Sequence, residues 1–465
     1  MQQQVSPVDY LIVNGLLVTM DATRRVITDG AIAIRADRIV EVGKSAELIA
    51  KYAAKRVIDA SSKVVTPGLI NCHAHATGEP LTKGFVPDDT PFEENVFQWL
   101  CPLYSVHEAE DEYLSALLIS IEMLKTGTTC FLEAGTVWFV DRVVEALVEV
   151  GIRARVGKWV WDMPQEPRVY RQTTDQAIRN LEQTLVQFRS QAEGRVQAWS
   201  MIIGHTTCSD ELMKAAKHYA DAYQVGLNMH MSPAAMDPEG FLQRTGRRPL
   251  EHIAELGVLG RNVVLVHMVH VNDDELRIAR EHEVNVVHCP TTALKVAYGV
   301  TQIGKFPEML EAGVNVCLGC DGNNAANYMD MLRAAYLAAG LFKDARRDPK
   351  MIPAEVAFEM ATRHGAKAML MADEIGSLEA GKKADIVLFD RRRPEWVPLH
   401  NVANSLVYSA TGQSVDTVFV DGRIVVEQGR MTTVDEEEIY RRAQAAGEAI
   451  IARTGLPRKM KWPVV

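Results

Sequence analysis

Apolar and polar positions alternate near both ends of the chain, in the way that half-buried β-strands require. Residues 9–66 contain short alternating segments such as "DYLIVNGLLVTMD", separated by turn residues. The same pattern returns in "KADIVLFD" and "TVFVDGRIVVEQG", where Asp421 and Gly422 between two apolar runs predict a tight hairpin. Each region is too short to fold alone. We therefore expect residues 1–66 and 376–435 to combine into one small β-sandwich domain.

The middle of the chain, residues 67–375, instead carries unbroken apolar runs that are separated by helical patterns. Continuous apolar runs are typical of parallel strands that are buried on both faces. Eight runs qualify as strands: "VVTPGLINCHAH", "GTTCFLEAG", "IRARVGKWVW", "VQAWSMIIGH", "VGLNMHMS", "NVVLVHM", "VNVVHCP" and "VNVCLGCDG". Eight strand–helix units predict an α/β fold, a (β/α)8 TIM barrel, with a doubly wound open sheet as the alternative. Residues 436–465 are expected to form a C-terminal helix and tail.

Size and charge exclude several classes of protein. The 465 residues exceed the roughly 250–300 residues of a single compact core, which agrees with one large and one small domain. A net charge of -10 argues against a nucleic acid partner, because phosphate binding needs a clustered basic face. The chain has neither a basic, apolar leader nor an apolar run of about 18 residues, so we expect a cytoplasmic protein with no membrane partner.

Histidines end several of the predicted strands, and in a barrel these ends form the catalytic face. His73 and His75 lie two residues apart and so share one face of the first strand. His230 ends the fifth strand and Asp321 ends the eighth, which completes a site of three histidines and one carboxylate. Such a set suits one divalent metal ion per subunit, with zinc expected and cobalt, iron or manganese as alternatives. The alternative for each histidine is a hydrogen-bonded pocket residue.

Several segments carry a resemblance to a known superfamily over almost the whole chain. The segments are "TPGLINCHAHA", "LKTGTTCFLEAG", "VGLNMHMS", "VVLVHMVHVNDDEL", "VNVVHCPTTALKVAYG" and "VNVCLGCDGNNAANYMDML", followed by "ATRHGAKAMLMADEIGSLEAGKKADIVLFD". In order and spacing they resemble the barrel-strand motifs of the amidohydrolase superfamily, in its mononuclear branch of deaminases and triazine hydrolases. Within that branch the chain most resembles the molinate (thiocarbamate) and phenylurea hydrolases. The resemblance also implies a homo-oligomer, a dimer or a tetramer.

The resemblance implies a role for each strand-end residue. His73, His75, His230 and Asp321 would bind the metal, His267 would contact the bound water or the substrate, and His288 would lie in the substrate pocket. Asp321 could then accept a proton from the water, and His267 could stabilise the developing oxyanion.

The chain departs from the deaminase pattern after the fifth strand. Deaminases of this branch carry a glutamate three residues after the strand-five histidine, where Pro233 stands here. The first acid downstream is Asp237, which would need a different loop path to reach the metal. This absence argues against a deaminase, whereas hydrolysis of an amide, urea or thiocarbamate needs oxyanion stabilisation and protonation of the leaving group, for which His205, His267 and His252 are the candidates in that order.

Aromatic residues in the connections after the first three strands predict an apolar mouth. They include Phe85, Phe92, Phe97, Trp99, Trp138, Phe139, Trp159 and Trp161, of which Trp99 and Trp138 are taken as substrate-binding. Such a mouth favours a small, neutral, apolar substrate, although core packing would also explain these side chains. The sequence therefore predicts a metal-dependent hydrolase of an amide, urea or thiocarbamate of herbicide type. A deaminase or s-triazine-type hydrolase is the first alternative, and a catalytically inactive binding paralogue is the second.

Overall fold

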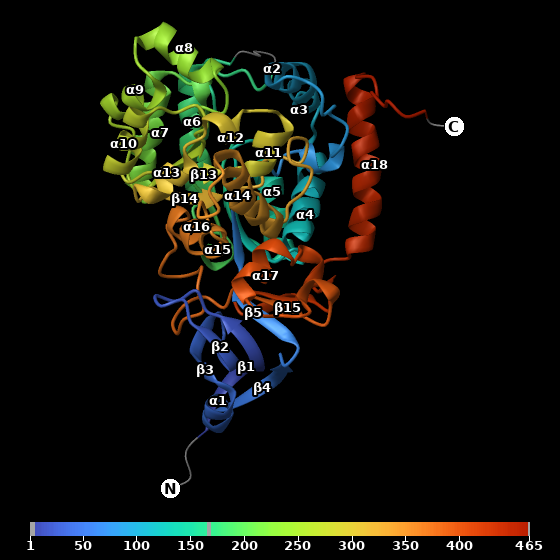
Figure 1. Ribbon diagram of the computed structural model, residues 1–465. Helices are drawn as coiled ribbons and strands as arrows, with labels where there is room; N and C mark the ends of the chain where they lie inside the picture. The colour runs from blue at the N-terminus through green and yellow to red at the C-terminus, as the bar shows by residue number, and fades with distance from the viewer. Residues whose placement is uncertain (1–4, 165–168, 464–465) are drawn as a thin grey trace.

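The computed structural model describes residues 5–164 and 169–463, and two sheet systems organise these residues (Figure 1). One is a nine-stranded sheet in the order β18-β17-β16-β15-β5-β1-β2-β3, with β4 paired to β1. Its strands are β1 (Ser6–Val18), β2 (Val26–Arg35), β3 (Arg38–Lys44), β4 (Tyr52–Asp59), β5 (Lys63–Pro67), β15 (Ile386–Asp390), β16 (Val415–Val420), β17 (Arg423–Glu427) and β18 (Arg430–Met431).

This sheet joins the two ends of the chain, as the alternating patterns predict. β15 lies between β5 and β16 and pairs antiparallel with both, with Leu388 opposite Val65. The predicted hairpin is also present, because Val420 pairs with Arg423 across Asp421 and Gly422. Both turn residues have positive φ, 49° and 69°, which is the conformation that a two-residue hairpin turn needs. The expected β domain built from both termini is confirmed.

The second system is the parallel barrel. Its strands are β6 (Leu69–Ala74), β7 (Thr128–Glu133), β8 (Arg153–Val156), β9 (Val196–Ala198), β10 (Ser200–Gly204), β11 (Leu227–Met231), β12 (Val263–His267), β13 (Asn285–His288) and β14 (Asn315–Leu318). They form two runs, β6 to β9 and β10 to β14. The fourth predicted strand is thus divided at Trp199, between β9 and β10. The residues after β14 return to β6, because Asp321 N–H donates to the His73 carbonyl at 2.8 Å.

Helices cover the barrel, and several of them begin at a residue whose side chain caps the helix. The helices are α1 (Ser45–Lys51), α2 (Phe92–Glu94), α3 (Cys101–Tyr104), α4 (Ala109–Lys125), α5 (Val140–Val150), α6 (Thr174–Gln187), α7 (Asp210–Tyr223), α8 (Met236–Thr245), α9 (Pro249–Glu255), α10 (Asp273–Glu281), α11 (Pro290–Lys295), α12 (Val300–Ile303), α13 (Phe306–Glu311), α14 (Met331–Arg346), α15 (Ala354–Met360), α16 (Arg363–Ala368), α17 (Val402–Tyr408) and α18 (Glu436–Thr454). Short turns are η1 (Glu79–Thr82), η2 (Asn95–Leu100, a π-helix), η3 (Ala192–Gly194), η4 (His205–Thr207), η5 (Pro394–Trp396) and η6 (Gly412–Ser414). Asn272 and Glu275 cap α10 reciprocally.

Buried charges tie the barrel to the β domain. Arg153, the first residue of β8, donates from Nε and Nη2 to the Asp385 carboxylate, both at 2.9 Å, and also contacts Asp421. The Arg153 and Asp385 side chains are 1% and 2% exposed, so each depends on the other for its charge. α18 then runs alongside α4 on the outside of the barrel (Figure 1). Among the described residues, no helix is both long and apolar enough to cross a membrane.

Candidate metal and active site

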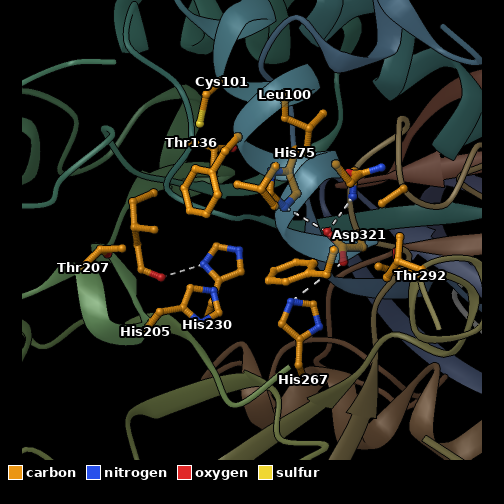
Figure 2. A pocket seen from close by; sticks show the side chains of 18 of the residues that line it. His75, Leu100, Cys101, Thr136, His205, Thr207, His230, His267, Thr292 and Asp321 are labelled. Carbon is orange, nitrogen blue, oxygen red and sulfur yellow. Dashed lines mark hydrogen bonds and ion pairs between the residues drawn. The ribbon is translucent and has the colours of Figure 1, made fainter. Parts of the chain in front are cut away.

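Four barrel strands bring their final residues to one cavity. His73 lies near the end of β6 and His75 follows it, His230 lies in β11, His267 ends β12, and Asp321 follows β14. All except His73 line the cavity, and Figure 2 shows their side chains around one space. The sequence prediction that these residues meet is therefore what the structure shows.

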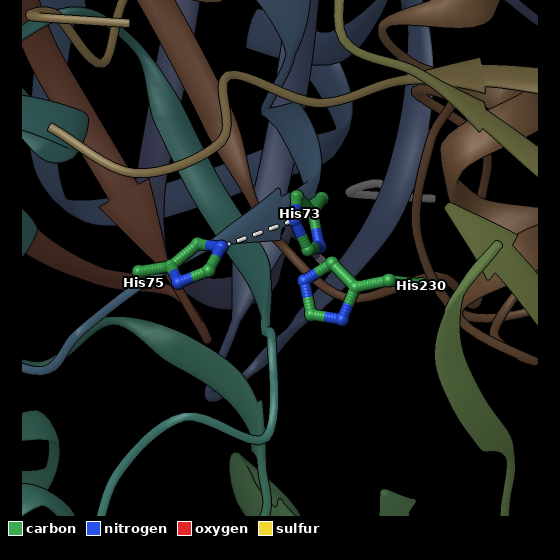
Figure 3. A group of neighbouring side chains, drawn as sticks. All are labelled: His73, His75 and His230. Carbon is green, nitrogen blue, oxygen red and sulfur yellow. Dashed lines mark hydrogen bonds between the residues drawn. The ribbon is translucent and has the colours of Figure 1, made fainter. Parts of the chain in front are cut away.

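The side-chain atoms are close enough to share one cation. His73 Nε2 and His75 Nε2 are 3.2 Å apart (Figure 3), and the Asp321 Oδ1 atom lies 3.3 Å from the first and 2.9 Å from the second. The ligand atoms of His73, His75 and His230 lie within 4.8 Å of one another. His267 Nε2 is 3.9 Å from Asp321 Oδ2.

These distances fit a divalent metal. Two imidazole nitrogens at about 2.0–2.1 Å from a tetrahedral ion lie about 3.3 Å apart, close to the spacing of His73 and His75. The tautomer of His230 also fits, because its Nδ1 donates to the Ile203 carbonyl at 2.7 Å and leaves the Nε2 lone pair free. Glu79 Oε1 lies 3.3 Å from His75 Nδ1, within ion-pair distance. The donor set of three imidazoles and one carboxylate suits zinc and similar ions.

Burial sets the protonation of the site. Removal from water lowers the pKa of His230 well below its usual value, and the neighbouring histidines lower it further. Burial also lowers the pKa of His267 to about 3. For Asp321 burial would raise the pKa, but the adjacent His73 and His75 outweigh it and hold the pKa well below the usual range. Burial would lower the pKa of His75 too, but Glu79 and Asp321 outweigh it and raise the pKa to about 9. Since neutral imidazoles and ionised carboxylates are the forms that bind metals, His75 would release a proton on binding one.

The backbone is strained at two of these positions. His267 and Asp321 have φ values of 80° and 74°, in the left-handed region that residues with a Cβ rarely adopt. Strain of this kind persists only where the surrounding structure enforces it, and it gathers at functional sites. Hydrophobic patterning gives no sign of it.

A second polar pair lies beside the metal residues. His205, in η4 after β10, has its ring against that of His230, with centroids 5.3 Å apart. Its Nδ1 lies 2.6 Å from Asp237 Oδ2, and that oxygen also accepts the Ser232 N–H at 2.7 Å. Asp237 is 1% exposed and lines the cavity, so the loop after β11 brings this acid to the cavity wall, where it pairs with His205.

Four predicted site residues do not reach the cavity wall. His288 faces away from the barrel interior, since its ring stacks on that of Phe306 in α13, with the ring centroids 4.0 Å apart. The residues before and after it point to the opposite face of the sheet. His252 pairs with Asp210 of α7 at 2.8 Å. Trp138 stacks on Tyr170, and Trp99 packs edge-on against Phe85. The prediction that these side chains line the pocket is corrected by this packing.

The cavity wall is nevertheless largely apolar, as the aromatic connections predict. Phe92 and Phe97 come from the segment after β6, and Trp159 and Trp161 follow β8. Tyr298, which follows α11, also lines the cavity and lies with its ring centroid 5.6 Å from that of His267. Such walls exclude water from the histidine cluster and favour a ligand with a flat or apolar body.

A TIM barrel with three histidines and an aspartate at the carboxyl ends of its strands defines a metal-dependent hydrolase. The chain belongs to the amidohydrolase family, whose model matches residues 64–425. It is 36% identical over 415 residues to a 5-methylthioadenosine/S-adenosylhomocysteine deaminase of Moorella thermoacetica, covering 89% of this chain and 94% of that protein. It is 32% identical to a 5'-deoxyadenosine deaminase of Methanosarcina acetivorans, over 96% of this chain and 99% of that one.

Solved structures show the same fold. An adenosine deaminase from Xanthomonas campestris with bound zinc superimposes with a TM-score of 0.90 at 28% identity, over 96% of this chain and 100% of that one. An atrazine chlorohydrolase from Arthrobacter aurescens in complex with zinc gives a TM-score of 0.86 at 22% identity, over 94% and 100% of the two chains. The chain is thus a metal-dependent hydrolase of this family that acts on carbon–nitrogen bonds.

Proposed function

We propose that this protein is an aminohydrolase that releases ammonia from an amino-substituted ring of purine type, such as that of a 5'-modified adenosine. The relatives named above support this alternative over a thiocarbamate or phenylurea hydrolase, since the named deaminases align with most of the chain. The observation that carries the proposal is the four-residue metal site beside a cavity with flat aromatic walls. Zinc is the ion we expect, in a soluble cytoplasmic enzyme that forms dimers or tetramers.

The residues present can carry out the required proton transfers. A divalent cation held by His73, His75, His230 and Asp321 would lower the pKa of a water molecule from 15.7 to about 7 and polarise the carbon under attack. The Asp321 carboxylate reaches into this cluster and can accept a proton from that water. His267 faces the same space and can donate a hydrogen bond to the oxygen that forms the new bond.

A second candidate function is hydrolysis of an amide, urea or thiocarbamate at its carbonyl carbon. The observation in its favour is Pro233, which leaves no glutamate three residues after His230 to protonate a ring nitrogen. Carbonyl hydrolysis requires only oxyanion stabilisation and protonation of an amine or thiol leaving group. The apolar cavity walls suit a small neutral substrate of this kind.

An assay of released products separates the two functions. The zinc-loaded protein is incubated with adenosine, 5'-deoxyadenosine and 5'-methylthioadenosine, and ammonia is measured. In parallel it is incubated with a phenylurea, an anilide and a thiocarbamate, and the freed amine or thiol is measured. Ammonia from the purines supports the proposal, and amine or thiol release alone transfers support to the second function. His73→Ala, which removes a ligand, is the control for background hydrolysis.

A further inference from the structure

No glutamate stands three residues after His230, but two buried carboxylates other than Asp321 line the cavity of the described site. These are Glu79 after β6 and Asp237 after β11. Glu79 is fully engaged, because it lies 3.3 Å from His75 Nδ1, accepts the Tyr104 hydroxyl and accepts the Asn324 N–H at 3.0 Å. It therefore orients a metal ligand from behind. Asp237 has a different partner, His205, whose side chain itself borders the cavity.

We infer that Asp237 is a positioning residue that replaces the absent glutamate by holding His205 as the proton donor to the leaving group. This inference rests on the proposed function. A single Asp237 oxygen accepts both the His205 ring, at 2.6 Å, and the Ser232 N–H, at 2.7 Å. The first bond occupies His205 Nδ1, so Nε2 is the ring nitrogen that remains available to a ligand. Nε2 has no hydrogen-bond partner among the described residues.

The position of His205 suits this work. Its ring lies against that of His230, a proposed metal ligand, and its side chain is 18% exposed and lines the cavity, whereas the Asp237 side chain is 1% exposed. His205 also has a positive φ of 53°. Gly204 before it has a φ of 84°, and a Cβ atom at this position would lie only 2.3 Å from the His230 carbonyl oxygen. The backbone thus runs close to β11, and the His205 ring lies beside that of His230 at the cavity wall.

The proton balance is complete without another reagent. Water supplies a hydroxyl group to the carbon and one proton to Asp321, and the carbon–nitrogen bond breaks with both electrons leaving on nitrogen. Asp321 passes that proton to His205 Nε2, and His205 then gives it to the departing nitrogen, which leaves as ammonia, so the ring ends as it began. Throughout, the Nδ1–H group stays hydrogen-bonded to Asp237, whose negative charge stabilises the ring while it carries the extra proton.

Asp237→Asn is a sharp test, because an amide oxygen can still accept both hydrogen bonds while the charge is lost. We expect kcat to fall about 100-fold, with KM changed less than about threefold. Glu239→Gln makes the same chemical change two residues away on the exposed side of α8 and should leave both constants unaltered. Bound metal, measured by elemental analysis, should be unchanged in both variants.

A double-mutant cycle then separates positioning from structural support. If Asp237 acts through His205, the Asp237→Asn change should reduce kcat less than about threefold in a His205→Gln background. Equal loss in both backgrounds overturns the inference, as does an Asp237→Asn enzyme with wild-type kcat. If the wild-type protein releases no ammonia but hydrolyses a carbonyl substrate, the proposed function fails, and the same cycle on that substrate still decides the role of Asp237.

Discussion

A buried histidine outside the active site makes the stability of this protein depend on acid. His288 ends β13, is 0% exposed, and lies against Phe306 and Phe342. Neither of its ring nitrogens has a hydrogen-bond partner in the described part of the chain. Burial lowers the pKa of His288 to about 3, because no group nearby compensates for the water that a charged ring would lose. The perturbation we consider is His288→Leu, which removes the titrating group at similar volume.

The size of the effect follows from the two pKa values. In the unfolded chain His288 takes up a proton below about pH 6.5, whereas in the folded protein it stays neutral down to about pH 3. Between these values the unfolded state binds more protons, so the free energy of unfolding falls as pH falls, by about 1.4 kcal/mol per pH unit. At pH 5 this one residue costs the wild-type protein about 2 kcal/mol, and above pH 7 it costs nothing.

Urea unfolding followed by circular dichroism at pH 7.5 and pH 5.0 measures this difference. The histidines of the candidate metal site are present in both proteins. Their contribution therefore cancels when the loss of stability between the two pH values is compared for wild type and His288→Leu. Between pH 7.5 and pH 5.0 the free energy of unfolding of His288→Leu should fall by about 2 kcal/mol less than that of the wild type. His288→Phe should show the same smaller fall, even if its different packing changes the free energy of unfolding at both pH values. His218→Leu, on the exposed face of α7, is the control. Equal losses in wild type and both His288 variants would refute the reasoning.

Three further predictions concern the interdomain charges, the metal and a helix. Arg153→Met should lower the free energy of unfolding by about 3–5 kcal/mol, measured by thermal melting, because it leaves the Asp385 charge buried and unpaired. His73→Ala should abolish stoichiometric metal in elemental analysis after dialysis, whereas the exposed His400→Ala should retain it. Gly340→Ala, inside α14 with open space around its Cβ position, should raise stability by about 0.5–1 kcal/mol, and an unchanged or lower melting temperature would contradict that.

The barrel and the metal site are readable from the sequence because both depend on local pattern. Continuous apolar runs mark strands buried on both faces, and the residue at the end of each run must lie at one rim of the barrel. His73, His75, His230 and Asp321 meet for this reason alone. The same logic places His205 and His267 at the rim, where the structure has them.

Other features of the site could not be predicted from the sequence, because they depend on which side of the sheet a strand-end residue faces and on the paths of the loops. His288 is the last residue of β13 and packs against Phe306 of α13, whereas His230 is the last residue but one of β11 and lines the cavity. Asp237 reaches the cavity because the chain turns after β11 so that its carboxylate accepts the Ser232 N–H, and the path of that loop has no signal in the apolar pattern. The break of the fourth strand at Trp199 likewise has no signal in its apolar run.

The pairing of β15 with β5 also fixes an order of events during synthesis on the ribosome. Every residue of the proposed metal site, from His73 to Asp321, leaves the ribosome before β15, whose Leu388 pairs with Val65. The barrel strands can therefore assemble, and take up their ion, while β5 still exposes an unpaired edge. An exposed strand edge invites pairing with other chains, so the interval before β15 arrives is when this protein is most open to aggregation.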